Sequence, residues 1–202
     1  MPSLSRLLAG LVSLAVLGYA EMQIIKAGGN GDHDLEFHPD SITAAVGSQV
    51  QFEWYPMNHS LASSTYDNVC EPDGKIFSGY FDPASGTMDK QTFVINITST
   101  EPIWYYCTQE YYTHCQNGMV GVINPPTSGP QTLAAYKAAS AAAKKIGDLP
   151  AAVGGVVVDA TSSAMAPSAS QSAMSSAAAS GLVLPWQGLA LCAIAIFVLP
   201  QQ

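Results

Sequence analysis

Residues 103–123, with the sequence IWYYCTQEYYTHCQNGMVGVI, bring together side chains that can bind a soft metal ion. Cys107, His114, Cys115 and Met119 fall within thirteen consecutive positions. A thiolate, an imidazole and a thioether at this spacing could hold a metal such as copper. Two cysteines so close to each other could equally belong to a structural disulfide. The choice between these two interpretations decides the class of protein.

A second imidazole would complete a copper ligand set. Two imidazoles and one thiolate, with a weak axial thioether, are the ligands of a blue copper centre. His59 lies in the segment YPMNHSLA, in an expected loop after a strand, and supplies the second imidazole. We therefore predict one copper site made of His59, Cys107, His114 and Met119. Four protein ligands leave no open position for a substrate, so the sequence favours a carrier of single electrons over an enzyme.

The number of cysteines bears on the same question. The region between the two ends of the chain has Cys70, Cys107 and Cys115, and one disulfide leaves one thiol over. If Cys107 binds a metal, Cys70 and Cys115 remain to form a disulfide that closes a loop of about 45 residues. Alternatively, Cys107 pairs with Cys70 or Cys115, His114 is a surface residue, and one thiol is left unexplained.

Both ends of the chain have the pattern of processing signals. Residues 1–20 carry one arginine, then an apolar stretch, then the small residues GYA, which predicts a secretory signal peptide. Residues 181–202 are an apolar tail behind the small-residue run SASQSAMSSAAAS, which predicts a GPI-anchor signal with attachment near Ser175 or Ser176. The alternative for the tail is a transmembrane helix. We expect a secreted protein at the cell surface, held by a GPI lipid, linked to the cell wall, or both.

Residues 21–126 have the pattern of one all-β domain. From Ser48 to Tyr55 apolar and polar residues alternate, which is typical of a half-buried strand. Further strands are expected at residues 22–27, 91–97, 102–107 and 119–124, with weaker candidates at 36–38, 41–45, 61–63 and 75–78. Seven or eight short strands separated by turn residues predict a Greek-key β-sandwich.

The part of the chain beyond the sandwich has a different composition. Residues 127–147 read as a linker and a short helix, whose apolar stripe is so thin that we expect it to pack loosely or not at all. Residues 148–180 are rich in alanine, serine and glycine and are expected to form a disordered stalk.

The charge balance limits the partners. Residues 21–126 have thirteen acidic residues against three lysines and no arginine, a net charge near minus ten. Such a surface repels nucleic acid and anionic lipid, so neither is expected as a partner. We expect a monomeric domain that meets the membrane only through its lipid anchor and exchanges electrons with an unidentified redox partner.

The order of the four ligand candidates resembles that of the cupredoxins, the family of blue copper proteins. The segment HCQNGMVGVIN is similar to plant phytocyanins, in which a cysteine directly follows the second histidine ligand. Together with FHPDSITAAVG, NHS, VCEP, the serine- and alanine-rich stalk and the apolar tail, it resembles extracellular serine-rich cupredoxins of fungi over about residues 22–126. The resemblance implies a cupredoxin-like sandwich, a type 1 copper site and a disulfide between Cys70 and Cys115.

One departure from the plant proteins concerns the ligand loop. Six residues, TQEYYT, separate Cys107 from His114, two more than plant phytocyanins usually have. We therefore expect the geometry of the site and its reduction potential to differ from theirs.

Two glycosylation sequons are present. We predict a glycan on Asn96, near the end of an expected strand. Asn58 directly precedes a proposed ligand, and the resemblance implies that it ties the ligand loops together by hydrogen bonds and so fixes ring orientation.

Two other functions are compatible with the same residues. The protein could capture or buffer copper at the surface without passing electrons on. It could also be a structural or adhesive glycosylated wall module in which copper is incidental or absent.

Overall fold

The structure is a computed structural model that describes residues 21–31, 33–144, 149 and 151–160. The expected signal peptide, the anchor signal and the attachment candidates Ser175 and Ser176 lie outside these residues. Within them, no helix has the length and apolar character that crossing a bilayer requires.

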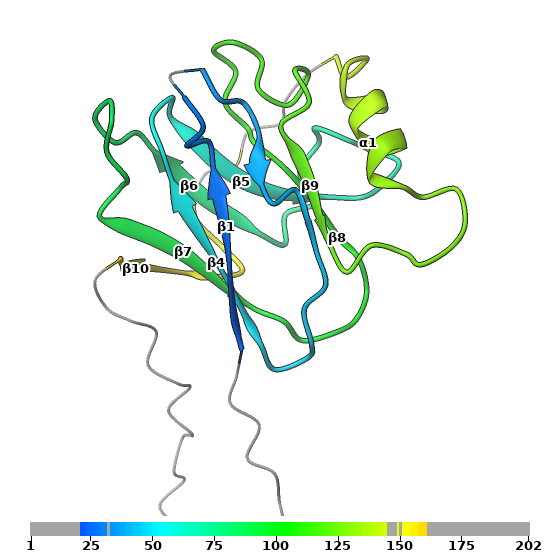
Figure 1. Ribbon diagram of the computed structural model, residues 1–202. Coiled ribbons are helices and arrows are strands. Elements are labelled where there is room, and N and C mark those ends of the chain that lie inside the picture. The colour runs from blue at the N-terminus through cyan, green and yellow to red at the C-terminus, as the bar shows by residue number, and fades with distance from the viewer. Residues whose placement is uncertain (1–20, 32, 145–148, 150, 161–202) are drawn as a thin grey trace, which may run out of the picture. The chain divides into compact units, whose positions relative to one another are not determined.

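The described residues form two five-stranded sheets and one short helix (Figure 1). The strands are β1 (Met22–Ala27), β2 (Phe37–His38), β3 (Ser41–Ile42), β4 (Gln49–Trp54), β5 (His59–Ser64), β6 (Phe77–Phe81), β7 (Gln91–Asn96), β8 (Ile103–Tyr106), β9 (Val120–Ile123) and β10 (Val156–Asp159). The first sheet has the order β10-β7-β4-β1-β2 and the second β3-β9-β8-β5-β6. Neighbours are antiparallel, except that β1 with β4 and β3 with β9 are parallel. The expected all-β sandwich is confirmed.

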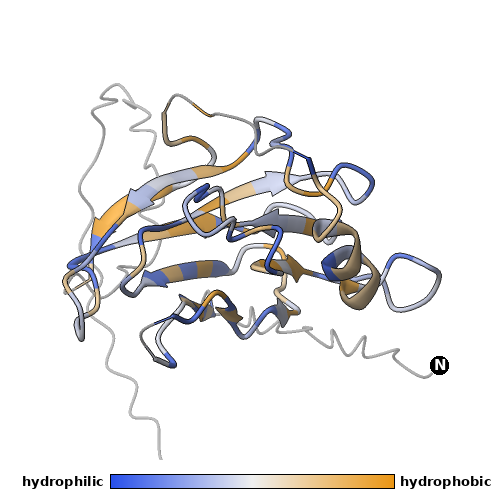
Figure 2. Ribbon diagram, turned by 90° about the horizontal axis from the view of Figure 1, so that it is seen from above, coloured by the Kyte–Doolittle hydropathy of each residue, from blue (hydrophilic) through white to orange (hydrophobic). Residues whose placement is uncertain are grey.

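The core lies between the sheets. In β4 the alternation predicted from the sequence is observed, because Val50, Phe52 and Trp54 are fully buried while the residues between them are half-buried. Phe52 contacts Tyr105 of β8 in the opposite sheet, with ring centroids 5.6 Å apart. Figure 2 shows apolar and hydrophilic residues alternating along the strands. These strands form the rigid base on which the loops at one end are held.

The structure differs from the sequence prediction in the number and the bounds of its strands. It has ten strands among the described residues rather than seven or eight. β5 begins at His59, two residues before the expected strand, so this histidine belongs to a strand and not to a loop. β6 begins at Phe77 instead of residue 75, because the Lys75 amide donates to the Asp73 carboxylate (3.0 Å) in a turn that precedes the strand.

The helix α1 (Leu133–Ser140) is shorter and better packed than expected. It begins after Thr132, whose hydroxyl accepts a hydrogen bond from the Ala135 amide (3.2 Å). Tyr136 is fully buried, its ring lies 4.8 Å from that of Trp104, and its hydroxyl is hydrogen-bonded to Ser64. The expectation of loose packing was wrong, because one buried aromatic residue anchors the helix in place of an apolar stripe.

The first part of the expected stalk is also ordered. Val156–Asp159 forms β10, which pairs with β7, and Val153 exchanges two backbone hydrogen bonds with Phe77 of β6. Gly155 permits this close approach, since a Cβ there would lie 2.4 Å from the Phe93 ring. The disorder expected from residue 148 onward was therefore wrong for residues 151–160. Composition indicates how much apolar side-chain area a segment can bury. Residues 151–160 are instead held mainly by backbone hydrogen bonds to the edges of the sheets.

Candidate metal centre

The candidate ligands come from three places at one end of the sandwich. His59 opens β5, Cys107 follows the last residue of β8, and His114 and Met119 lie in the loop between β8 and β9. Backbone hydrogen bonds close this loop: the Cys107 amide donates to the Met119 carbonyl (3.0 Å), and the Met119 amide donates to the His114 carbonyl (3.0 Å). The loop thus returns His114 and Met119 to the side of Cys107.

The two imidazoles and the thiol form a compact, buried group. Cys107 Sγ lies 3.4 Å from His114 Nδ1 and 4.0 Å from His59 Nδ1. The three candidate ligand atoms lie within 4.8 Å of one another, and all three residues are buried. The ring centroids of the two histidines are 5.0 Å apart. Both rings direct Nδ1 toward the sulfur, so each can offer the same nitrogen to one metal ion.

Met119 is placed beside this group by its backbone. Its side chain is fully buried and belongs to the same apolar cluster as Cys107. A thioether is a soft donor of the kind that serves as a weak ligand of copper.

Burial keeps both histidines neutral. It lowers the pKa of His59 to about 4, although the Pro56 carbonyl, Asp34 and Asp82 oppose the shift. Burial and the nearby His59 lower the pKa of His114 to about 4 as well. At neutral pH both rings are therefore uncharged, which is the state that binds a metal.

The thiol behaves differently. Burial raises the pKa of Cys107, although hydrogen bonds involving Gln109 and Ser60 act in the opposite direction. The Ser60 amide donates to Cys107 Sγ at 3.4 Å. A buried thiolate needs a compensating positive charge. Two neutral nitrogen donors and one sulfur that is charged only beside a cation fit a copper ion.

The pH dependence of stability follows from the two histidine pKa values. The unfolded chain takes up protons on His59 and His114 as the pH falls below about 6.5, whereas the native state resists until about pH 4. We expect the free energy of unfolding of the metal-free protein to fall as the pH is lowered through this window. Urea unfolding at a series of pH values measures it. His59→Gln should reduce the slope of unfolding free energy against pH. A slope equal to that of the unaltered protein would contradict the low pKa of His59.

Gly28, which the sequence analysis did not single out, leaves room for the His59 ring. A Cβ on Gly28 would lie 2.8 Å from His59 Nε2, and Gly28 has a φ of +75°. Because the contact is with a strand far along the chain, no local signal could have revealed it.

Gly28→Ala is expected to weaken copper binding by about 10–100-fold, the range typical of lost outer-shell support. The added methyl group would displace the His59 ring. Gly86→Ala is a matched control, because Gly86 has the same φ of +75° and an added Cβ there would meet no atom within 4 Å. In both variants, backbone strain should lower the free energy of unfolding by about 1–2 kcal/mol. Copper titration and urea unfolding separate the two effects, and equal copper affinities in both variants would refute the role of Gly28.

A hydrogen bond at Asn58 joins the segment that leads into His59 to the loop that follows Cys107. Gln109, two residues after Cys107, donates its side-chain amide to the Asn58 carbonyl (3.2 Å). Asn58 itself has a left-handed φ of +56°. The hydrogen bond between the two ligand segments is therefore accepted by the main-chain oxygen of Asn58.

Cys70 and Cys115 form a disulfide, and Cys107 is a free, buried thiol. The two bonded residues are 45 positions apart in sequence, and both are fully buried. Cys115 directly follows His114, so the bridge fixes the ligand loop to the segment after β5.

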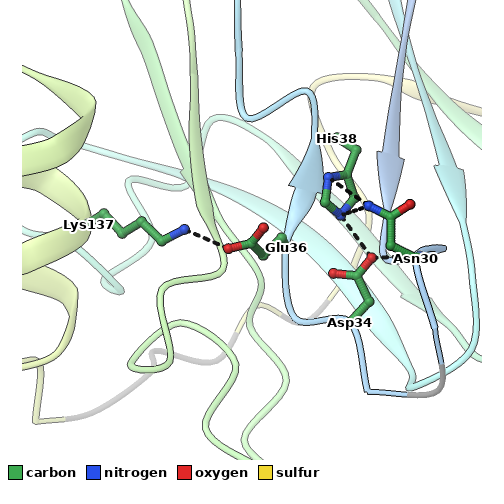
Figure 3. Close-up of polar contacts among 5 residues, drawn as sticks. All are labelled: Asn30, Asp34, Glu36, His38 and Lys137. Atoms are coloured by element: carbon green, nitrogen blue, oxygen red, sulfur yellow. Dashed lines mark hydrogen bonds and ion pairs between the residues drawn. The ribbon is translucent and has the colours of Figure 1, made fainter.

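A second group of possible ligands follows Gly28 closely in the sequence and consists of Asp34, Glu36 and His38 (Figure 3). Asp34 Oδ2 contacts His38 Nε2 (2.8 Å), and Glu36 pairs with Lys137 of α1 (2.9 Å). Asp34 is thus paired with His38, and the Glu36–Lys137 ion pair joins the segment before β2 to α1.

A small β-sandwich with a buried thiol and two imidazoles at one end has the architecture and the donors of a blue copper domain. The chain is 37% identical over 134 residues to a probable GPI-anchored cupredoxin of Arthroderma benhamiae, covering 66% of this chain and 67% of that protein. It belongs to the cupredoxin family. It is also 37% identical over 123 residues to an extracellular serine-rich protein of the same organism, covering 58% of this chain but only 44% of that relative.

Solved structures with a similar fold include a native pseudoazurin from Hyphomicrobium denitrificans, with 18% identity and a TM-score of 0.35 over 51% of this chain and 73% of that one. Another is the oxidised plastocyanin from Dryopteris crassirhizoma, with 21% identity and a TM-score of 0.31 over 50% of this chain and 96% of that one. No family model matches the chain.

Proposed function

We propose that this protein is a blue copper protein that carries single electrons at the cell surface. The observation that supports this most directly is the approach of two neutral imidazole Nδ1 atoms to the free sulfur of Cys107 in a buried site. His59, Cys107 and His114 would hold the copper, with Met119 as the weak axial ligand. The copper would supply a centre that gains and loses one electron.

The residues of the chain favour a carrier over an enzyme. The three ligands of the buried group are at most 1% exposed, so a substrate has little access to the metal position. The hydrogen bonds that close the ligand loop and the disulfide next to it hold the ligands in one arrangement. A fixed ligand geometry reduces the rearrangement that accompanies a change of charge, which suits electron transfer.

Copper titration of the purified protein tests this function. We expect one Cu(II) per chain, an intense visible absorption from the thiolate–copper bond, and reversible one-electron reduction. Copper binding without that absorption would contradict a type 1 site. The absorption together with very slow electron exchange would instead favour capture or storage of copper.

The surface location is supported by the names of the relatives, one GPI-anchored and one extracellular. We propose that residues 1–20 direct secretion and that a GPI lipid is attached near Ser175 or Ser176. A phospholipase specific for phosphatidylinositol should release the protein from intact cells. Retention after the enzyme but release by glucanase would indicate a link to the wall instead.

A glycan on Asn96 is proposed because this residue ends β7 and is exposed. Its side-chain oxygen accepts a hydrogen bond from Gln49 (2.8 Å) at the surface. Removal of N-glycans should lower the mass of the secreted protein, and Asn96→Gln should abolish that difference.

A further inference from the structure

An open cavity of about 710 Å³ lies at the ends of the strands away from the candidate metal centre, and residues of both sheets line it. Ser64, the last residue of β5, lines this cavity, whereas His59 begins the same strand. Ile103, the first residue of β8, also lines it, whereas Cys107 follows the end of that strand. The volume is in the range typical of sites that bind small ligands. The cavity is therefore a candidate site separate from the metal centre.

Residues 151–160, here called the strap, connect the two sheets beside this cavity. Val153 exchanges two backbone hydrogen bonds with Phe77 of β6, in the second sheet. Val156 pairs with Val94 of β7, in the first sheet, and it also lines the cavity. The Val156 side chain is 58% exposed. A ligand in the cavity would therefore contact the strap as well as the sheets.

Asn96 places a glycosylation sequon at the edge of the cavity. It is the last residue of β7 and lines the cavity, as does Thr98 at the third position of the sequon. Gln49 of β4 donates to Asn96 Oδ1 (2.8 Å), and β4 lies on the side of β7 opposite to β10. The planar amide thus directs its oxygen toward β4 and its nitrogen away from that strand. The nitrogen is the atom that carries the sugar of an N-glycan, so the hydrogen bond from Gln49 can persist after glycosylation.

The lining offers the contacts that an N-acetylated sugar can use. Such a sugar has an apolar ring face and a methyl group in addition to its hydroxyls. Pro102 and Ile103 are half-buried and present apolar surface to the cavity. Among the residues that the structure describes, the exposed Glu101 carboxylate has no hydrogen-bond or ion-pair partner, so it can accept hydrogen bonds from sugar hydroxyls. A sugar attached at the edge of the cavity has a high local concentration there, so weak contacts are enough to hold it.

We propose that the cavity is the seat of the N-glycan carried by Asn96, and that the innermost N-acetylglucosamine contacts β7, the start of β8 and the strap. This inference rests on the glycan proposed above. The sugar packs against Ile103 and Val156 and donates hydrogen bonds to Glu101. It thereby hinders separation of the strap from the sheets, so the glycan stabilises the segment that leads to the C-terminal part of the chain.

Amide hydrogen exchange of the full-length secreted protein, followed by mass spectrometry, tests the effect on the strap. Three forms are compared: the protein with its complete glycan, the protein trimmed by endoglycosidase H to one N-acetylglucosamine, and the variant Asn96→Gln. The first two should exchange equally slowly in residues 151–160, whereas Asn96→Gln should exchange several-fold faster there. Exchange in β1 and the visible spectrum with copper should be the same in all three, because the cavity lies away from the metal centre.

Glu101→Ala separates contact with the sugar from the loss of the hydrogen bond that Asn96 itself accepts. In the glycosylated protein this variant should speed exchange in the strap, and in the Asn96→Gln background it should add nothing. Glu71→Ala is the matched control, because Glu71 is exposed and is not part of the cavity lining. An equal effect of Glu101→Ala with and without the glycan would contradict the proposed contact.

Nuclear Overhauser measurements on the isotope-labelled glycoprotein locate the sugar directly. The N-acetyl methyl protons of the innermost sugar should show contacts with the side chains of Ile103 and Val156. Free N,N′-diacetylchitobiose distinguishes the attached glycan from an external one. It should not shift the Ile103 methyl resonances of the glycosylated protein, because the attached sugar already fills the site. A shift in that protein would mean that the cavity takes a glycan from outside, and would overturn the inference.

The outcomes separate the seat of the glycan from its existence. A protein that carries a glycan on Asn96 but shows no contact of its innermost sugar with Ile103 or Val156 would overturn this inference alone. If Asn96→Gln leaves the mass of the secreted protein without a glycan difference, the glycan and its seat are overturned together. Neither result bears on the copper centre, which the visible spectrum tests separately.

Discussion

Cys107→Ser is expected to abolish the visible absorption of the copper-loaded protein and to weaken copper binding by more than about 100-fold, since loss of even an outer-shell partner costs about 10–100-fold. The hydroxyl of serine is a hard donor that stays protonated at neutral pH, so it cannot replace the soft thiolate. The two neutral histidines would remain, but they lack the negative charge that a cation needs in a buried site.

The double variant Cys70→Ala/Cys115→Ala is the control for this experiment, because it removes the other two cysteines of the described residues and leaves Cys107 in place. Under conditions in which circular dichroism shows that this variant is folded, it should keep an intense thiolate–copper absorption, because Cys107 is unchanged. Copper content and visible spectra of the two proteins, measured side by side, test the assignment. An unchanged spectrum in Cys107→Ser would exclude this sulfur as a ligand.

The same double variant is expected to have the largest effect on stability. A disulfide that closes a loop of 45 residues contributes about 4 kcal/mol in the chain-entropy model. Both cysteines are fully buried and pack with Trp104 and Tyr136, so their loss also leaves unfilled space in the core. The bridge therefore stabilises both the fold and the loop that carries His114.

Urea unfolding of the unaltered and the double-variant proteins at neutral pH measures this contribution. Reduction of the native disulfide under the same conditions is an independent route to the same quantity. If both experiments lower the free energy of unfolding by less than about 1 kcal/mol, the unfolded chain gains little conformational freedom when the disulfide is removed, which would contradict the expected contribution.

The agreement between sequence and structure is greatest where chemistry and periodicity are local. The alternation in β4 predicted a buried face, and Val50, Phe52 and Trp54 form it. The expected strands 102–107 and 119–124 placed Cys107 and Met119 at facing strand ends, and the structure puts both just outside those strands, in a loop that closes on itself. The free Cys107 and the bridge at Cys115 also agree with the family resemblance.

The differences arise from contacts between distant parts of the chain. β10 pairs with β7 more than 60 positions away, so the composition of its own segment could not reveal it. Gly28 is needed for a ring on another strand, and Ser60 contacts a sulfur 47 positions later. α1 is anchored through Tyr136, whose burial depends on Trp104 and Tyr66. None of these partners is visible in a local pattern.

X-ray absorption at the copper edge of the loaded protein tests the central claim most directly, because it counts the atoms bound to the metal. The arrangement of His59, Cys107 and His114 predicts one short copper–sulfur bond and two copper–nitrogen bonds. A copper ion surrounded only by nitrogen and oxygen atoms would contradict it.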